Sequence, residues 1–189
     1  MARVSISEAS RLTGKSRTTL HRLIKAGDLS TCSGERNAKM VDTSELLRVF
    51  GKTINSAQQE IRLMGYSFTS PEVAGALVRA KQRGLDVKVV LDWKANTGRQ
   101  NKASLAAMNL LVNAGIPVRT VSQYKIMHDK VIIADGRNVE VGSFNYTRAA
   151  DRVNSENVLV VWDVPVVAQH YLRHWQSRWN GGTDWYSSY

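Results

Sequence analysis

The stretch that decides the fold is His128-Asp129-Lys130-Val131-Ile132-Ile133-Ala134-Asp135, and Gly142-Ser143-Phe144-Asn145 follows it closely. The apolar run Val131–Ile133 and the run Val139–Val141, in which two valines flank Glu140, predict two short buried strands. Gly136-Arg137-Asn138 predicts the turn that joins them. Polar, chemically reactive residues therefore lie at the start of one predicted strand and the end of the next.

The faces of these strands predict which of the polar side chains meet. Residues two apart on an extended strand point to the same side. His128 and Lys130 should share one face, and so should Ser143 and Asn145, which gathers an imidazole, an ammonium, a hydroxyl and an amide. Such a set supplies a nucleophile or acid and donors suited to a phosphate. Asp135 lies an odd number of residues from His128, so we expect it to be structural and to order the following turn.

The spacing H-x-K-x4-D-x6-G-S-x-N is complete in this chain, which in this respect resembles the phospholipase D superfamily. A closer resemblance, from about residue 53 to residue 189, is to the small single-motif bacterial endonucleases of the Nuc type. It rests on Tyr66-Ser67-Phe68, Asn96-Thr97-Gly98-Arg99, Asn154-Ser155-Glu156-Asn157 and Ser187-Ser188-Tyr189. The N-terminal part of the chain does not share it.

This resemblance implies a role for each residue of the motif. His128 would attack phosphorus and form a covalent phosphohistidine, which divides phosphodiester cleavage into two easier steps. Lys130 and Asn145 would stabilise the charge on the phosphate oxygens. Ser143 would donate to the phosphate or to a neighbouring side chain, and Glu156 would hold the second nitrogen of the nucleophilic imidazole.

The reaction also needs a general acid for the leaving oxygen, and one histidine cannot hold both roles at once. Single-motif members of the superfamily dimerise, so the resemblance implies a homodimer in which two copies of His128 meet across a two-fold axis. His170 and His174 lie four residues apart on one predicted helix face without companions of a motif, which favours a packing role. We expect neither a metal site nor a cofactor.

Composition narrows the class of partner and compartment. The 189 residues carry a net charge of +10 with a pI near 10.0, which favours a polyanionic partner such as a nucleic acid. Cys32 is the single cysteine, so the chain cannot form an internal disulfide. No apolar run approaches the roughly 20 residues of a membrane span, and the N-terminus lacks the apolar region of a signal peptide. We therefore expect a cytoplasmic protein with no membrane partner.

Residues 1–50 predict a small separate module. Ser5–Glu8 forms an S-x-x-E capping box for a first helix, and Ser16 can cap a second helix that ends before Gly27. A hairpin is predicted within Thr31–Asp42, and a third helix follows. The segment resembles the winged helix-turn-helix modules of the excisionase and MerR type. That resemblance predicts DNA contacts from the second helix, at Arg17, Thr18, Thr19 and Arg22. A small helical packing unit with solvated charges is the alternative.

Residues 51–189 predict an α/β domain of the phospholipase D-like kind, a mixed sheet flanked by helices. Strands are expected at 61–68, 87–93, 118–121, 128–134, 139–143 and 158–162, and helices at 71–83, 105–113 and 166–179. The run Ser44–Glu60 reads as one continuous helix. Lys94–Lys102 reads as a basic loop, in which Lys94, Arg99 and Lys102 are candidate DNA contacts.

Three functions compete on these grounds. The first is a dimeric, metal-independent phosphodiesterase that cleaves DNA, with RNA as a second substrate and without base-specific contacts in the catalytic domain. The second is a phospholipase or phosphatidyl transferase, because the same chemistry serves lipid head groups. The third is a DNA-binding regulator that uses the catalytic domain for dimerisation.

Overall fold

The computed structural model describes residues 3–5, 32–33, 39–42 and 45–187, with side chains from residue 51 onward. Seven strands form its main sheet: β4 (Glu60–Gly65), β5 (Asp86–Asp92), β6 (Val118–Val121), β7 (Lys130–Ala134), β8 (Asn138–Gly142), β9 (Val158–Val161) and β10 (Thr183–Asp184). Their order across the sheet is β10-β6-β5-β4-β7-β8-β9. Strands β4, β5 and β6 are parallel, whereas β7, β8 and β9 continue the sheet in antiparallel pairs, so the sheet is mixed as predicted.

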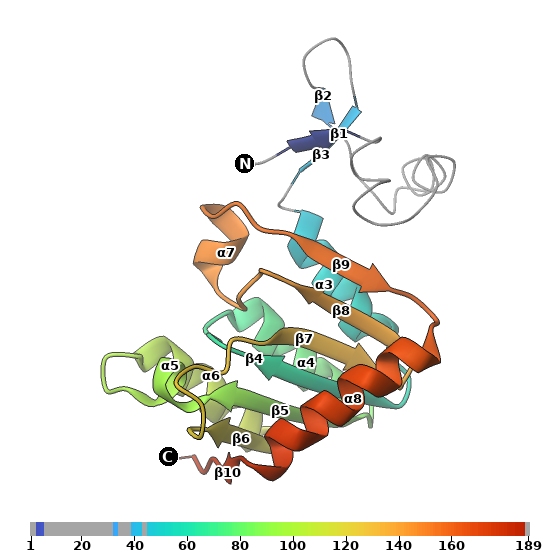
Figure 1. The fold of residues 1–189 in the computed structure, drawn as a ribbon. Coiled ribbons are helices and arrows are strands. Elements are labelled where there is room, and N and C mark those ends of the chain that lie inside the picture. The colour runs from blue at the N-terminus through green and yellow to red at the C-terminus, as the bar shows by residue number, and fades with distance from the viewer. Residues whose placement is uncertain (1–2, 6–31, 34–38, 43–44, 188–189) are drawn as a thin grey trace.

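Helices cover both faces of this sheet (Figure 1). They are α3 (Glu45–Ser56), α4 (Pro71–Gln82), α5 (Trp93–Thr97), α6 (Lys102–Asn113), α7 (Arg148–Arg152) and α8 (Pro165–Asn180). In Figure 1, α8 crosses the near face of the sheet, and α3 and α4 lie behind it. Of the helices that the structure describes, none combines the length and apolar composition that crossing a bilayer requires.

The alternation of side chains along the strands produces two cores. Leu63 and Ile132 belong to the larger core, together with buried residues of α3, α4 and α6. Their sequence neighbours Met64 and Ile133 point to the opposite face, where Trp175 of α8 packs in the second core. Strand β7 is therefore apolar on both faces after Lys130, which explains why Val131–Ala134 is a continuous apolar run.

Two expected elements differ from the observed ones. The helix that was expected to continue to Glu60 ends at Ser56, and Glu60 already belongs to β4. The predicted basic loop begins with the short helix α5, because the Asp92 carboxylate caps it by accepting the backbone N–H of Ala95 at 2.7 Å. Trp93, which was counted in the preceding strand, therefore starts a helix and is half exposed.

The N-terminal part contributes a separate three-stranded sheet in the order β1-β3-β2. Its strands are β1 (Arg3–Ser5), β2 (Cys32–Ser33) and β3 (Lys39–Asp42), and β2 pairs antiparallel with β3 where a hairpin was predicted. The two helices of the predicted helix-turn-helix lie outside the described residues, as do Arg17, Thr18, Thr19 and Arg22.

A buried carboxyl group joins α3 to the sheet. Glu140 of β8 is 1% exposed, and the hydroxyl of Thr53 in α3 donates a short hydrogen bond to its Oε2. Its other oxygen, Oε1, has no hydrogen-bond partner among the described residues. Burial raises the pKa of Glu140 to about 8, and the Thr53 hydrogen bond lowers it only in part. The folded protein therefore holds a proton here at neutral pH.

This proton makes stability depend on pH. The unfolded chain loses it near the ordinary value of 4.5, whereas the folded chain keeps it to about pH 8, so stability should fall between those limits as pH rises. The slope is about 1.4 kcal/mol per pH unit for one such group. Glu140→Gln keeps a hydrogen-bonding amide without the titration, so its stability relative to wild type should increase from pH 5 to pH 8. Urea unfolding across that range tests this expectation, and a constant difference between the two proteins would contradict it.

Candidate active site

The motif residues other than Asp135 lie at one edge of the sheet because of the strand register. Gly65 at the end of β4 pairs with Lys130 at the start of β7, and it also pairs with Leu91 near the end of β5. Gly142 at the end of β8 pairs with Val158 at the start of β9. The carboxyl ends of β4, β5, β6 and β8 therefore lie beside the starts of β7 and β9. We call this edge the motif edge.

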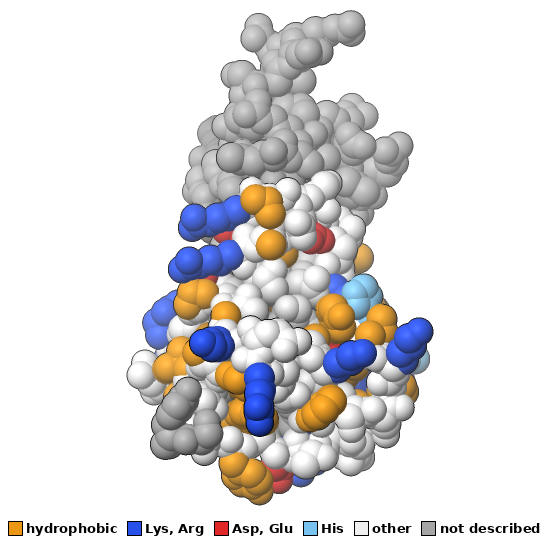
Figure 2. Space-filling view, turned by 90° about the vertical axis from the view of Figure 1, so that its left-hand side faces the viewer, with side chains coloured by type: hydrophobic (Ala, Val, Ile, Leu, Met, Phe, Trp, Pro, Cys, Tyr) orange, Lys and Arg blue, Asp and Glu red, His pale blue; other side chains and the backbone are white. Residues whose placement is uncertain are grey.

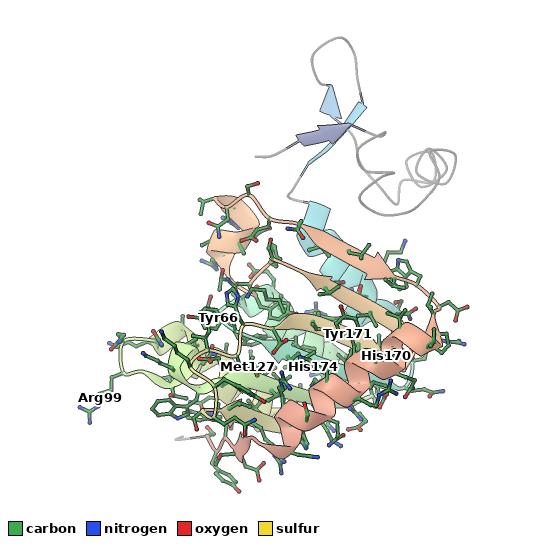
Figure 3. The ribbon with its side chains drawn as sticks, viewed as in Figure 1. Tyr66, Arg99, Met127, His170, Tyr171 and His174 are labelled. Atoms are coloured by element: carbon green, nitrogen blue, oxygen red, sulfur yellow. The ribbon has the colours of Figure 1, made fainter. Side chains whose placement is uncertain are left out.

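His128 and Lys130 lie around the ring of Tyr66, which follows β4. The His128 imidazole meets the Tyr66 ring edge-on, with 4.9 Å between ring centroids, and the Lys130 Nζ lies 5.4 Å from the centre of the same ring. His128 is exposed to solvent, whereas Lys130 is 7% exposed. Figure 3 shows Tyr66 and Met127 at this edge. A solvent-accessible imidazole thus lies beside a largely buried cation.

The charge of Lys130 is balanced locally. Burial lowers the pKa of this ammonium, and the carboxylates of Asp129 and Glu156 oppose that shift. The Nζ also donates a hydrogen bond of 2.8 Å to the backbone carbonyl of His128. Lys130 therefore links the charge of the site to the backbone position of its histidine.

Ser143 and Glu156 form a second cluster at the motif edge. The Ser143 hydroxyl donates a short hydrogen bond to Glu156 and accepts one of 3.0 Å from the backbone N–H of Asn157. The remaining oxygen of Glu156 accepts from the side chain of Asn154 at 2.9 Å. In the described part of this single chain, Glu156 makes no hydrogen bond to His128, so its expected role as holder of that imidazole stays a prediction.

The lack of a side chain at Gly142 lets the backbone of Asn157 lie close to the Ser143 loop. A Cβ atom at this position would collide with the carbonyl oxygen of Asn157, to which Ser143 donates its backbone N–H at 3.0 Å. Asn145 follows on the same loop, and its Oδ1 is buried without a hydrogen-bond partner among the described residues. An unpaired buried oxygen costs free energy, which indicates that a further donor completes the site.

Asp135 lies at the opposite end of β7, away from the motif edge. Its carboxylate accepts the backbone N–H groups of Gln58, Gln59 and Glu60 at 2.8–3.1 Å. It adopts a positive φ of 55° before Gly136. Asp135 thus orders the connection between α3 and β4, in addition to the turn that follows it in sequence.

Two buried polar residues support the motif edge, and sequence analysis did not assign either of them this role. The Asp92 carboxylate, which caps α5, also accepts the backbone N–H of Met127 at 2.7 Å. Asn96 is fully buried and donates to the backbone carbonyls of Tyr66 and Asp92 at 2.7 and 2.8 Å. A carboxylate at the end of a buried strand was the available signal for Asp92. Asn96 was noted only as part of the family resemblance.

The surface around the motif edge is basic. Figure 2 looks at the side on which α5 and α7 lie, and Lys and Arg side chains are spread over it with few acidic ones in view. The predicted DNA contacts Lys94, Arg99 and Lys102 are all exposed on or beside α5 and the start of α6, and Figure 3 shows Arg99 projecting from the body. Arg148 and Arg152 of α7 add two more exposed cations.

Within the part of the chain that the structure describes, no three His, Cys, Asp or Glu side chains are grouped so as to hold a metal ion.

Two known enzymes are similar in sequence to this chain over more than half of its length. Phospholipase D of Rickettsia bellii is 38% identical over 126 residues, which are 66% of this chain and 59% of the relative. Mitochondrial cardiolipin hydrolase of Mus musculus is 33% identical over 138 residues, which are 72% of this chain and 57% of the relative. The chain thus spans less than two thirds of the length of these curated relatives.

Among solved structures, Nuc from Salmonella typhimurium, a phospholipase D family member, is similar with a TM-score of 0.71 and 54% identity. The similarity covers 74% of this chain and 90% of Nuc. NucT from Helicobacter pylori has a TM-score of 0.64 at 23% identity, covering 76% of this chain and 92% of NucT, which supports the fold alone.

A family model described as "Cardiolipin synthase, PLD-like domain" matches residues 51–179. These residues contain the complete sheet from β4 to β9 and every residue of the motif. The chain therefore belongs to the phospholipase D-like domain family, whose members are generally phosphodiesterases or hydrolases.

Proposed function

We propose that the protein is a metal-independent endonuclease that cleaves DNA, and RNA as a second substrate, through a covalent phosphohistidine in a homodimeric site. The observation that carries this proposal is the placement of the exposed His128 imidazole and the buried Lys130 ammonium around one Tyr66 ring, at an edge surrounded by cations. Such an edge attracts a phosphate backbone irrespective of base sequence.

In the proposed reaction, an imidazole nitrogen of His128 attacks phosphorus while the bond to the leaving oxygen breaks. Lys130 and Asn145 stabilise the negative charge that builds up on the phosphate oxygens. The leaving oxygen takes a proton from the His128 imidazolium of a second copy. Water then attacks the phosphohistidine and returns a proton to that second imidazole, so both histidines end as they began.

Two features support the involvement of a second copy. The reaction needs a separate acid. Besides His128, the histidines with described side chains are His170 and His174, and both lie on α8, where they contact Arg173 and Asp129. The Oδ1 of Asn145, which has no partner among the described residues, is also open to a donor from outside the single chain. A two-fold assembly at the motif edge would supply both.

A lipid phosphodiester is the second candidate substrate. It is favoured by the similarity to phospholipase D and cardiolipin hydrolase, and by the exposed apolar residues Trp93, Ile126 and Val153. The 54% identity with Nuc and the net charge of +10 favour nucleic acid over lipid. We further propose that residues 1–50 form a DNA-binding module and residues 51–189 the catalytic domain.

Incubation with supercoiled plasmid in excess EDTA tests the proposed function. We expect nicking to persist at the rate seen without chelator, because Lys130 and Asn145 supply the charge stabilisation that a metal ion provides elsewhere. Cardiolipin vesicles form the parallel arm, in which we expect little release of head group. Activity that disappears with EDTA and returns with Mg²⁺ would overturn the metal-independent mechanism, and preferential vesicle hydrolysis would favour the lipid substrate.

A further inference from the structure

A contact between the motif and the final helix falls outside the roles assigned so far. Asp129, the residue between His128 and Lys130, has the same strand parity as Val131 and Ile133, whose side chains lie in the core under α8. The Nε2 of His174 in α8 lies 2.9 Å from its Oδ1, and Arg178 Nε lies 4.0 Å from its Oδ2. Consecutive residues of the motif thus point to opposite faces.

The segment before β7 is held from several directions. The backbone N–H of Met127 is bound by Asp92, the carbonyl of His128 by Lys130, and the side chain of Asp129 by His174. By contrast, no hydrogen bond within the described residues fixes the His128 imidazole itself, whose ring contact is with Tyr66. The direction of this imidazole therefore depends on how well its backbone is fixed.

We propose that His174 is a positioning residue of the active site, which acts through Asp129 on the backbone that carries the His128 imidazole and the Lys130 ammonium. This inference rests on the proposed function. The charged groups that act on Asp129 are Arg178 on α8 and Lys130 on β7, and Glu156 ahead of β9 acts on Lys130 in turn. Burial lowers the pKa of Lys130, and the Asp129 carboxylate raises it. The contact with His174 holds that carboxylate in place.

The expected effect falls on turnover and not on folding. The side chains of His174 and Asp129 are 37% and 24% exposed, and a partly exposed pair contributes little to the free energy of unfolding. A small displacement of a reacting group, however, can lower kcat by about 100-fold. His174→Ala should lower kcat by about 10-fold to about 100-fold, with KM and Tm near those of wild type.

The chain offers both a rescue variant and a matched control. His174→Gln places an amide nitrogen near the position of Nε2, so it should restore most of kcat. His170→Ala removes a histidine one turn earlier on α8, where the ring is exposed and faces Arg173, and it should leave kcat unchanged. Asp129→Asn removes the charge that sustains the Lys130 pKa, so activity should decline at a lower alkaline pH than in wild type.

Hydrolysis of bis(p-nitrophenyl) phosphate measures kcat and KM without deciding between nucleic acid and lipid. The inference is supported if His174→Ala lowers kcat, His174→Gln restores it, and His170→Ala leaves it unchanged. Equal activities of His174→Ala and His170→Ala overturn it, as does a loss that glutamine fails to restore.

NMR separates failure of this inference from failure of the proposed function. If wild type hydrolyses no phosphodiester, the proposed function fails, and the imidazole ¹⁵N resonances of His128 then decide the positioning role. These resonances are identified by their loss in His128→Ala. A change in His174→Ala that is absent in His170→Ala supports the role, whereas unchanged His128 resonances in both variants overturn it.

Discussion

Replacement of His128 by alanine should abolish cleavage, with a loss in kcat of about 10⁵-fold or more, as is typical when a covalent nucleophile is removed. The His128 side chain is exposed at the motif edge and makes no hydrogen bond within the described residues, so its removal should leave the fold intact. Plasmid nicking measures the loss, and His170→Ala on α8 is the control. A folded His128→Ala protein with wild-type activity would show that His128 is not the nucleophile, whereas a wild type that does not cleave would favour the regulator hypothesis.

Mixing this variant with wild type tests whether two chains share one site. If subunits exchange at random in an equal mixture, about a quarter of the dimers contain two wild-type chains. Activity per wild-type chain should then fall to about half of its unmixed value, because each mixed dimer lacks either nucleophile or acid. Sedimentation with a tagged variant establishes the exchange. Unchanged activity despite proven exchange would show that each chain carries a complete site.

Replacement of Lys130 by alanine should lower kcat by about 100-fold or more, as expected when a preorganised donor to developing charge is lost. Lys130 is 7% exposed and its ammonium lies beside the Tyr66 ring, so a dissolved cation cannot readily take its place. Lys88→Ala on β5 is the matched control, because this lysine lies away from the motif edge. It pairs in register with Arg62 and lies four residues before Asp92, the last residue of β5. Single-turnover rates on plasmid or on a phosphodiester analogue measure the difference.

Asp135→Asn gives the contrasting outcome in the same motif. It should weaken three backbone contacts at residues 58–60 and lower the unfolding free energy, while kcat per folded dimer stays near that of wild type. If this variant loses turnover in a folded dimer and Lys130→Ala loses little, the assignment of strand faces is incorrect.

The sheet and its two cores were predictable because β-branched runs and glycine-bounded helices carry strong periodic signals. Short helices were not, since five residues such as Arg148–Arg152 show no period; α7 begins where the Thr147 hydroxyl accepts the N–H of Ala150 at 3.2 Å. His174 was visible as a histidine four residues after His170, but its partner Asp129 lies 45 residues away on another element. Strand parity puts Asp129 on the face opposite Lys130, yet parity does not say which helix covers that face.

The pairing of β4 with β7 has a consequence for the order in which the elements fold during synthesis. Residues 60–121 alternate strand and helix and can associate as soon as they leave the ribosome, because their contacts are close in sequence. Strand β7 must then reach back 65 residues to align Lys130 with Gly65, and β8 and β9 follow it. The motif edge is thus completed late in synthesis, after its parallel half has formed a template. Nascent chains arrested before β7 should expose the open side of β4 and recruit chaperones that recognise unpaired strands.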